Sequence, residues 1–201
     1  MPFTSLGLSP DLLRAVSAKA YLTPTAIQAA VIPAVLEGRD VLASAQTGSG
    51  KTAAFALPLL QLLQQTTSEK PRRVHVLILV PTRELAAQVA DTLKGFAQAL
   101  PQAVKVVSLF GGVSVNPQMM KLRGGADIVV ATPGRLLDLV GSNALVLSGV
   151  AALVLDEADR LFDLGFADEL ARILALLPPK RQNLFFSATF PPAVQTLAKQ
   201  L

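Results

Sequence analysis

The segment at residues 45–52 contains residue types whose spacing suits the binding of a nucleoside triphosphate. It lies between an apolar run and a helical pattern, and it reads Ala45-Gln46-Thr47-Gly48-Ser49-Gly50-Lys51-Thr52. Small residues let backbone N–H groups surround an anion at a helix N-terminus, where the helix dipole is positive. Lys51 is expected to serve the outer phosphates, and the Thr52 hydroxyl to bind Mg²⁺. Because Ala45 replaces the usual first glycine, this segment alone leaves open the alternative of a glycine-rich turn with an unrelated lysine.

Two adjacent carboxylates follow the apolar run at 151–155, far along the chain from the glycine-rich segment. Carboxylates at the end of a buried strand beside a phosphate loop suit metal chemistry. We expect Asp156 to hold Mg²⁺ partly through water and Glu157 to position or deprotonate the attacking water, so that both act in catalysis with Lys51. The alternative is an acidic first turn of a helix, which needs no ligand.

The elements that must position these groups alternate along the chain, after helical patterns at 11–16 and 26–32. Strands are expected at 40–45, 74–80, 105–110, 127–131, 151–155 and 183–187. Helices are expected at 51–65, 82–100, 116–123, 134–140, 168–177 and 192–201. This alternation predicts an α/β fold with a parallel sheet flanked by helices on both faces, and with ligands at the carboxyl ends of the strands.

Length and composition fit one soluble domain. The 201 residues carry 18 basic and 14 acidic side chains, a formal net charge of +4 and a pI near 9.7. This mild basic excess permits a polyanionic partner. The chain has no cysteine, which excludes a disulfide scaffold and fits a cytoplasmic location. Since no apolar run reaches membrane-spanning length and no secretion signal is present, we expect no membrane partner, and no oligomer is predicted.

These motifs, together with the segments at 3–10 and 187–191, resemble those of the amino-terminal RecA-like half of a DEAD-box RNA helicase. The tetrad that names this family stands here as Asp156-Glu157-Ala158-Asp159. The resemblance covers essentially the whole chain, with the motifs in the family order, and it implies a single RecA-like P-loop NTPase domain over residues 1–201. Residues 111–120 and 180–184 resemble the bacterial RhlE branch of the family.

The resemblance implies an adenine-reading segment within a helical N-terminal extension, residues 1–38. Tyr21 is similar to the aromatic residue that stacks on the base, and Gln28 to the amide that offers the adenine edge both a donor and an acceptor. Ala20 stands where the family usually has glycine, and Ala26 where proline is common. Phe3 resembles an upstream aromatic that braces this segment, with core packing as the alternative. The residues implied to hold ATP, and ADP after hydrolysis, are Tyr21, Gln28, Gln46, Thr47, Gly48, Ser49, Gly50, Lys51 and Thr52.

Three further segments resemble those that hold RNA by its backbone in this family. Each follows an expected strand, so N–H groups, hydroxyls and guanidinium groups can meet phosphates instead of bases. The residues are Pro81, Thr82, Arg83, Gly111, Gly112, Thr132, Pro133, Gly134 and Arg135. A fourth segment, with Ser187 and Thr189, resembles the one that hydrogen-bonds to Asp159 and couples the nucleotide site to RNA-driven closure.

The implied function is the ATP-binding and partly RNA-binding half of an enzyme that couples ATP hydrolysis to local unwinding or remodelling of RNA. In this family ATP and single-stranded or duplex RNA bind between two RecA-like domains, and the second domain, with its arginine fingers, is absent from this chain. We therefore expect the chain alone to bind nucleotide but to hydrolyse and unwind poorly. The alternatives are a nucleotide-gated RNA-binding module without turnover, and a DNA helicase or another phosphate-loop ATPase.

Several other residues are expected to be structural. His75, at the start of a strand, has no sequence neighbours that would complete a catalytic triad or a metal site. Met119 and Met120 are expected to pack in the core, as is the helical stripe formed by Leu170, Ile173, Leu174 and Leu177.

Overall fold

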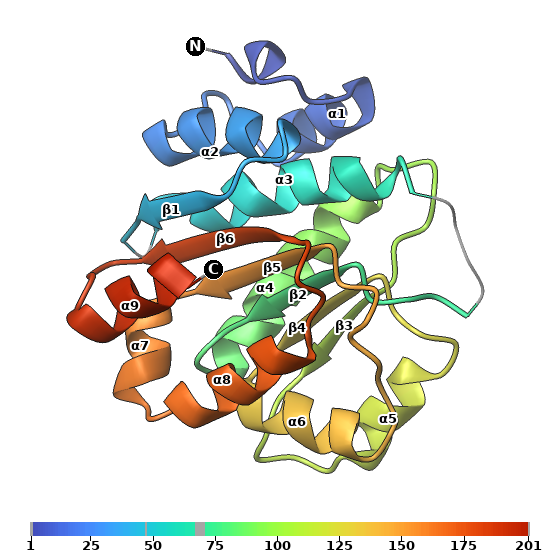
Figure 1. The fold of residues 1–201 in the computed structure, drawn as a ribbon. Coiled ribbons are helices and arrows are strands. Elements are labelled where there is room, and N and C mark those ends of the chain that lie inside the picture. Colours follow the sequence, from blue (N-terminus) through green and yellow to red (C-terminus); the bar gives the residue numbers. More distant parts are fainter. Residues whose placement is uncertain (1, 47, 67–70, 201) are drawn as a thin grey trace.

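The computed structural model describes residues 2–46, 48–66 and 71–200. In this part of the chain six strands form one sheet, in the order β1-β6-β5-β2-β4-β3 (Figure 1). Every adjacent pair is parallel. The strands are β1 (Val41–Ser44), β2 (Val76–Leu79), β3 (Val106–Leu109), β4 (Ile128–Ala131), β5 (Ala152–Asp156) and β6 (Gln182–Ser187). The predicted parallel sheet is confirmed.

The central strands are buried on both faces, because their apolar sequences are uninterrupted. All residues of β2, β4 and β5 are buried. Side chains alternate between two apolar layers, so that Val76 and Ile78 belong to one cluster and Leu77 and Leu79 to the other. β1 is only half-buried, since it forms one edge of the sheet.

Helices cover both faces of the sheet (Figure 1). One face packs against η1 (Phe3–Ser5), α1 (Pro10–Ala18), α2 (Ala26–Leu36), α3 (Lys51–Leu63) and α4 (Arg83–Ala97). The other packs against α5 (Asn116–Leu122), α6 (Pro133–Gly141), α7 (Ala158–Asp163), α8 (Ala167–Leu176) and α9 (Pro192–Gln200). Within the described ranges, none of these helices has the length and apolar character that crossing a membrane requires.

The expected elements are present, and two differences are informative. Helix α7 was not predicted, because six residues are too few to show a helical repeat of apolar side chains. The helix expected at 26–32 continues through Pro33 to Leu36. Pro33 removes only one backbone hydrogen-bond donor, and the packing of α2 against α3 maintains the helix beyond it. The helices expected to reach residues 65 and 100 end earlier, at Leu63 and Ala97.

The core contains most of the apolar side chains that were expected there, but not the methionines. Leu170, Ile173 and Leu177 are buried and Leu174 packs against their cluster, as predicted. The prediction for Met119 and Met120 was wrong, because their side chains are 37% and 62% exposed. Helix α5 buries only Gln118 and Leu122, so it presents both methionines to solvent. Phe3 is buried in the same cluster as α1 and α2.

Candidate functional site

The carboxyl ends of the strands form one edge of the sheet, and it has two distinct halves. In the first, β1, β6 and β5 are neighbours and lead into residues 45–52, 187–189 and 156–160, which we call the buried half. In the second, β2, β4 and β3 lead into residues 81–83, 132–135 and 111–112, which we call the exposed half. The predicted nucleotide loop and acidic tetrad thus lie in one half and the predicted RNA segments in the other.

The phosphate loop is bent by two glycines with left-handed backbone, Gly48 at φ +82° and Gly50 at φ +87°. Gly50 is the N-cap of α3, so Lys51 and Thr52 begin that helix. Ser49 Oγ is buried and has no hydrogen-bond partner among the described residues. An unpartnered hydroxyl beside a helix N-terminus fits an anionic ligand. The other predicted loop residues are Gln46, which is exposed, and Thr47, which lies outside the described residues.

Lys51 meets two carboxylates that lie far along the chain. Its Nζ is 2.9 Å from Asp156 Oδ1 and 3.2 Å from Glu157 Oε1, a residue 106 positions away. All three residues are buried. A buried ammonium group and buried carboxylates are stable together only when they are paired. The structure therefore brings together the loop lysine, which follows β1, and the acidic pair at the end of β5.

Asp156 lies in surroundings that fit a cation. The residue is fully buried; Oδ1 faces the Lys51 ammonium group at 2.9 Å, and Oδ2 has no hydrogen-bond partner among the described residues. Burial raises the pKa of Asp156, and the attraction of Lys51 opposes this rise only in part. A buried carboxylate with one oxygen that no protein donor reaches suits Mg²⁺, which takes one or two protein carboxylates and keeps water and phosphate oxygens as its other ligands. The residues present therefore fit this ion, with the Thr52 hydroxyl on the adjoining helix as the second predicted ligand.

Glu157 is held from two sides in a strained conformation. Its φ of +53° lies in the left-handed region, which non-glycine residues seldom adopt. One carboxylate oxygen faces Lys51, and the other accepts a hydrogen bond from Arg160 Nη1 at 2.9 Å. Backbone strain of this kind clusters at functional sites, where surrounding contacts maintain it. The bend at Glu157 redirects the chain from β5 into α7 and fixes the direction of this carboxylate.

Asp159 joins the end of β5 to the end of β6. Its Oδ2 accepts hydrogen bonds from the Thr189 hydroxyl at 2.7 Å and from the Thr189 N–H at 2.9 Å. Ser187 Oγ accepts the Asp159 N–H at 3.0 Å and donates to the Thr189 carbonyl at 2.6 Å. Burial alone would raise the pKa of Asp159, but these hydrogen bonds and one from the Arg160 N–H outweigh it, so the pKa is lowered. The predicted partners are in contact, and their coupling role stays a prediction.

Gln28 ties the N-terminal helices to the phosphate loop. Its Oε1 accepts the Thr25 N–H at 3.0 Å, and its Nε2 donates to the Gly50 carbonyl at 3.1 Å. Thr25 and Gln28 form a capping box at the start of α2. The φ of +87° at Gly50 favours glycine, and a Cβ there would lie 2.5 Å from Gln28 Nε2, so that a side chain would displace this amide. Both ends of the amide are engaged within the protein, and adenine recognition by Gln28 stays a prediction.

Tyr21 is 39% exposed and packs beside Phe96 of α4, with 6.0 Å between the ring centroids. The preceding residue, Ala20, has a φ of +58°. Glycine adopts this left-handed conformation without the steric cost that alanine carries. The segment thus keeps a backbone geometry that suits glycine, although the residue is alanine. Stacking of a base on Tyr21 stays a prediction.

The exposed half is built from helix starts and glycines. Thr82 Oγ1 accepts the Leu85 N–H at 3.2 Å as the N-cap of α4, and Arg83 follows it with an exposed side chain. Gly111 and Gly112 are both exposed after β3. Backbone N–H groups at such positions are accessible to phosphates. Pro81, which precedes Thr82, is buried.

Helix α6 contributes the remaining predicted RNA residues of the exposed half. Its N-cap is Thr132 and its first residue is Pro133, whose missing N–H costs nothing at that position. Gly134 has open space around its Cα, so a ligand can approach the backbone closely. Arg135 Nη2 donates to the Val113 carbonyl at 2.9 Å, whereas its Nη1 is buried without a partner among the described residues. Arg135 thereby connects the start of α6 to the loop after β3.

Two residues that the sequence analysis missed support the site. Thr25 was detectable, because Thr25 and Gln28 have the spacing of a capping box. Arg160 was not, because its contact with Glu157 depends on α7, which was itself not predicted. His75, expected to be structural, precedes β2 at the opposite edge of the sheet.

Comparison with known proteins gives a consistent result. A family profile described as DEAD/DEAH box helicase matches residues 25–197. The chain is 48% identical over 196 residues to the ATP-dependent RNA helicase DeaD of Mycobacterium tuberculosis (strain ATCC 25618 / H37Rv), covering 98% of this chain and 34% of that protein. It is 48% identical over 197 residues to the ATP-dependent RNA helicase dbp10 of Schizosaccharomyces pombe, covering 98% of this chain and 23% of that protein. The chain thus spans between 23% and 34% of the length of these relatives.

Solved structures show the same similarity. The RNA-helicase Prp28 from Chaetomium thermophilum bound to ADP superposes with a TM-score of 0.90 at 43% identity, covering 99% of this chain and 48% of that one. A DEAD box protein from Methanococcus jannaschii superposes with a TM-score of 0.90 at 39% identity, covering 100% of this chain and 53% of that one. The predicted RecA-like fold is therefore confirmed.

Proposed function

The chain belongs to the DEAD/DEAH box helicase family, and from this premise we propose that it is the ATP-binding and partly RNA-binding half of an ATP-dependent RNA helicase. The observation that carries the proposal is the convergence of Lys51 with Asp156 and Glu157, at 2.9 Å and 3.2 Å. A lysine of a phosphate loop beside two buried carboxylates is the arrangement expected for phosphoryl transfer to water. The relatives named as RNA helicases support the choice of RNA as the partner.

Nucleotide binding requires Lys51 to change partners. Its ammonium group lies between Asp156 and Glu157 and must turn toward the outer phosphates of ATP. Mg²⁺ supplies charge neutralisation at the β- and γ-phosphates when it is bound, and Asp156 and Thr52 are the residues that would hold it. The Ser49 hydroxyl and the loop N–H groups surround the phosphates.

Glu157 is then free to act on water. Once Lys51 has turned to the nucleotide, Arg160 still holds one carboxylate oxygen of Glu157 at 2.9 Å. The other oxygen can accept a hydrogen bond from a water molecule and orient it toward the γ-phosphate. ADP and phosphate are the products.

RNA is proposed to bind the exposed half through its backbone. Arg83, Gly112 and Arg135 lie on three adjacent strand ends, so a single strand can cross all three. Phosphate contacts of this kind fix position and carry no sequence information. In the strand order of the sheet, β6 and β5 lie between β1, which leads into the phosphate loop, and β2, which leads into the first RNA segment. The hydrogen bonds between Asp159 and Thr189 join the segments after β5 and β6, and they are proposed to couple RNA binding to hydrolysis.

Because the chain spans only 23% to 34% of the length of these relatives, activity of the whole protein is proposed to require a second RecA-like domain. That domain would close over ATP and RNA and add cationic groups that stabilise the transition state. The chain alone is proposed to bind nucleotide with little hydrolysis and no unwinding. The RhlE branch and a cytoplasmic location stay predictions.

The proposal is tested by calorimetric titration of this chain with ADP and ATP, with and without Mg²⁺. We expect binding that Lys51→Ala weakens at least tenfold, with Lys94→Ala as a control because Lys94 forms an exposed ion pair on α4. Failure of the unmodified chain to bind either nucleotide would refute the proposal.

The helicase activity is tested on the full-length protein by duplex separation with RNA and DNA substrates, beside a Glu157→Gln variant. We expect ATP-dependent separation of RNA that this variant loses. Equal rates for the variant and the unmodified protein would remove the role assigned to Glu157, and a preference for DNA would favour the DNA helicase alternative.

A further inference from the structure

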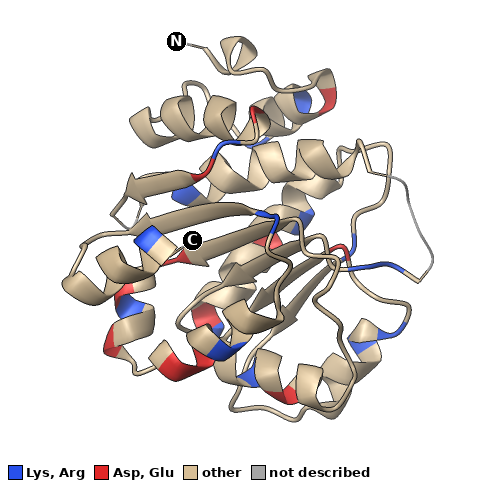
Figure 2. Cartoon of the chain, viewed as in Figure 1, with Lys and Arg blue, Asp and Glu red and all other residues tan. Residues whose placement is uncertain are grey.

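Basic residues gather at the amino edge of the sheet, opposite the candidate site, on the segments that lead into β2, β3 and β4 (Figure 2). The basic residues of these segments are Arg72, Arg73, Lys105 and Arg123, with Lys121 in the last turn of α5. In the described segments 71–75, 98–105, 121–127 and 142–151, Asp127 is the one carboxylate. Acidic residues instead gather on α7 and α8 (Figure 2). The amino edge therefore has a positive electrostatic potential.

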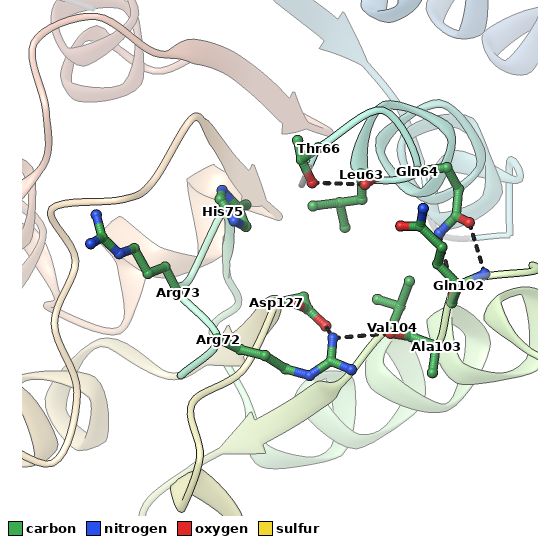
Figure 3. Close-up of a pocket in the computed structure, with 10 residues that line it drawn as sticks. All are labelled: Leu63, Gln64, Thr66, Arg72, Arg73, His75, Gln102, Ala103, Val104 and Asp127. Carbon is green, nitrogen blue, oxygen red and sulfur yellow. Dashed lines mark hydrogen bonds and ion pairs between the residues drawn. The ribbon is translucent and has the colours of Figure 1, made fainter. Parts of the chain in front are cut away.

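The one carboxylate of this surface is already engaged inside the protein. Arg72 forms an ion pair with Asp127 and donates to the Ala103 carbonyl at 3.0 Å (Figure 3). Asp127 also accepts the Lys105 N–H at 2.6 Å. Arg73 points away from this cluster (Figure 3). Asp127 is therefore paired with Arg72, and the described residues of these segments carry more basic than acidic groups.

Close backbone packing holds the segments of this surface in place. The Arg72 N–H donates to the Gly124 carbonyl at 3.1 Å. A Cβ at Gly125 would lie 1.9 Å from the Arg72 carbonyl oxygen, and one at Gly149 would lie 3.2 Å from Arg73 Cβ. Only glycine permits contacts this close at Gly125. The backbone segments of this surface therefore need little further ordering when a partner binds, which reduces the entropy lost on binding.

The surface is hollowed and partly apolar. Two adjoining hollows share Leu122 and Ala144; one contains Arg72, Arg73 and Val146, and the other Met120 and Arg123. We call the two together the basic groove. Val146 is 66% exposed and Met120 is 62% exposed. Exposed apolar side chains beside basic ones indicate a protein-binding surface, for which methionine is well suited because its side chain adapts to different partners.

We propose that the basic groove binds a short acidic, amphipathic helix of a partner protein. Carboxylates of that helix meet Arg73 and Arg123, and its apolar side chains, spaced three and four residues apart, cover Met120 and Val146. Arginine and methionine are both enriched in protein interfaces. RNA fits less well, because the described lining residues include no aromatic side chain on which a base could stack. The proposal does not depend on the proposed function.

The probe is a fluorescein-labelled 18-residue peptide with glutamates on one helical face and leucines on the other. Its controls are a scrambled peptide of the same composition, a peptide with lysine in place of glutamate, and an 18-nucleotide single-stranded RNA. Binding to the 201-residue chain is measured by fluorescence anisotropy at 100 mM salt, and the site is located by amide chemical-shift changes in NMR spectra. We expect the acidic amphipathic peptide to bind at least tenfold more tightly than both peptide controls, with shifts at Arg73, Met120, Arg123 and Val146.

Three variants test the contacts. Arg73→Glu combined with Arg123→Glu is expected to weaken the peptide at least tenfold, and Met120→Ser to weaken it several-fold. Arg172→Glu on α8, an exposed arginine outside the groove, should leave affinity unchanged. Unchanged thermal unfolding of each variant shows that the fold persists. Equal binding of the scrambled peptide, absence of binding, shifts confined to other surfaces, or tighter RNA binding at the same residues would each overturn the proposal.

Discussion

The two halves of the carboxyl edge use the same architecture in opposite ways. In the buried half, charged side chains are removed from water and satisfy one another, as Lys51 does with Asp156 and Glu157. In the exposed half, Gly111, Gly112 and the Arg83 side chain, which is 53% exposed, are accessible, whereas Arg135 is held by the Val113 carbonyl. The strands themselves do not account for the difference, because β2 and β4, which lead into the exposed half, are as fully buried as β5. The difference arises in the segments that follow the strands.

This difference predicts where single substitutions matter. A buried charge depends on one or two specific partners, so that removing a partner costs stability as well as function. An accessible phosphate contact is one of many, and each contributes little. Substitutions in the buried half should therefore change stability and ligand affinity together, whereas those in the exposed half should change RNA affinity alone.

The largest effect is expected for Lys51→Ala. Two buried carboxylates would lose their ammonium partner, and breaking a buried pair in this way costs about 3 kcal/mol of unfolding free energy. Without Lys51 the pKa of Asp156 rises further, so the loss should shrink as the pH falls and the carboxyl becomes protonated. Urea unfolding at pH 8 and pH 5.5 measures this, with Lys94→Ala as the matched exposed lysine, expected to cost less than about 0.5 kcal/mol. Equal losses for the two variants would show that burial does not separate the halves.

Thr189→Val should come next, because valine keeps the shape of threonine and removes its hydroxyl from Asp159. Loss of a hydrogen bond to a carboxylate costs about 1.5 kcal/mol. Asp159 has a lowered pKa, so its contribution to stability is present above the ordinary carboxyl pKa of 3.8 and is lost as the pH falls through the lower folded-state pKa. The difference between the urea midpoints of the variant and the unmodified chain should therefore be largest at pH 7 and should decrease toward pH 3. A gap independent of pH would mean that the hydroxyl does not act through Asp159.

Asp156→Asn is expected to act in the opposite direction in the nucleotide-free chain. Because burial raises the pKa of Asp156, this carboxyl favours folding only when protonated, and that contribution is lost as the pH rises through the folded-state pKa. At pH 8 the variant should therefore unfold at a higher temperature, by about 2 °C or more, while its affinity for Mg²⁺–ATP falls. Calorimetry with and without Mg²⁺ measures both. A lower unfolding temperature at pH 8 would show that the pairing with Lys51 outweighs the cost of burial.

Much of the arrangement of the carboxyl edge could be predicted from the sequence, because the strands and the motifs that follow them depend on local patterns. Uninterrupted apolar runs identified the buried strands. The glycine-rich and acidic segments identified the ligand-binding residues that follow two of these strands. Two contacts that support the site could not be predicted: Gln28 of α2 meets Gly50 at the start of α3, 22 residues along the chain, and Arg160 meets Glu157 across the first turn of α7, a helix that was not predicted. The exposed methionines were misassigned because α5 is too short for its apolar residues to reveal which face is buried.

Ala20→Gly tests the backbone next to Tyr21, which lies outside both halves of the carboxyl edge. Alanine at φ +58° carries a steric cost of about 1 kcal/mol that glycine avoids, although glycine loses more entropy on folding. We expect the variant to be more stable by about 0.5 kcal/mol, measured by urea unfolding. Ala29→Gly, within α2, is the control and should destabilise by about 1 kcal/mol. Destabilisation by both changes would mean that the backbone at Ala20 is not strained in solution.

The smallest effect is expected for Arg83→Ala in the exposed half. Within the described part of the chain its guanidinium group forms an ion pair with Glu84, a neighbour that is itself exposed, so unfolding should be unchanged within about 0.5 kcal/mol. Affinity for single-stranded RNA should fall about threefold, and the slope of log affinity against log salt should decrease by about 0.7, as expected for the loss of one phosphate contact. Anisotropy titrations between 50 and 200 mM salt measure both, with Arg172→Ala as the control. If Arg83→Ala destabilised the fold as much as Thr189→Val, the exposed half would depend on internal charge pairing too, and the contrast between the two halves would fail.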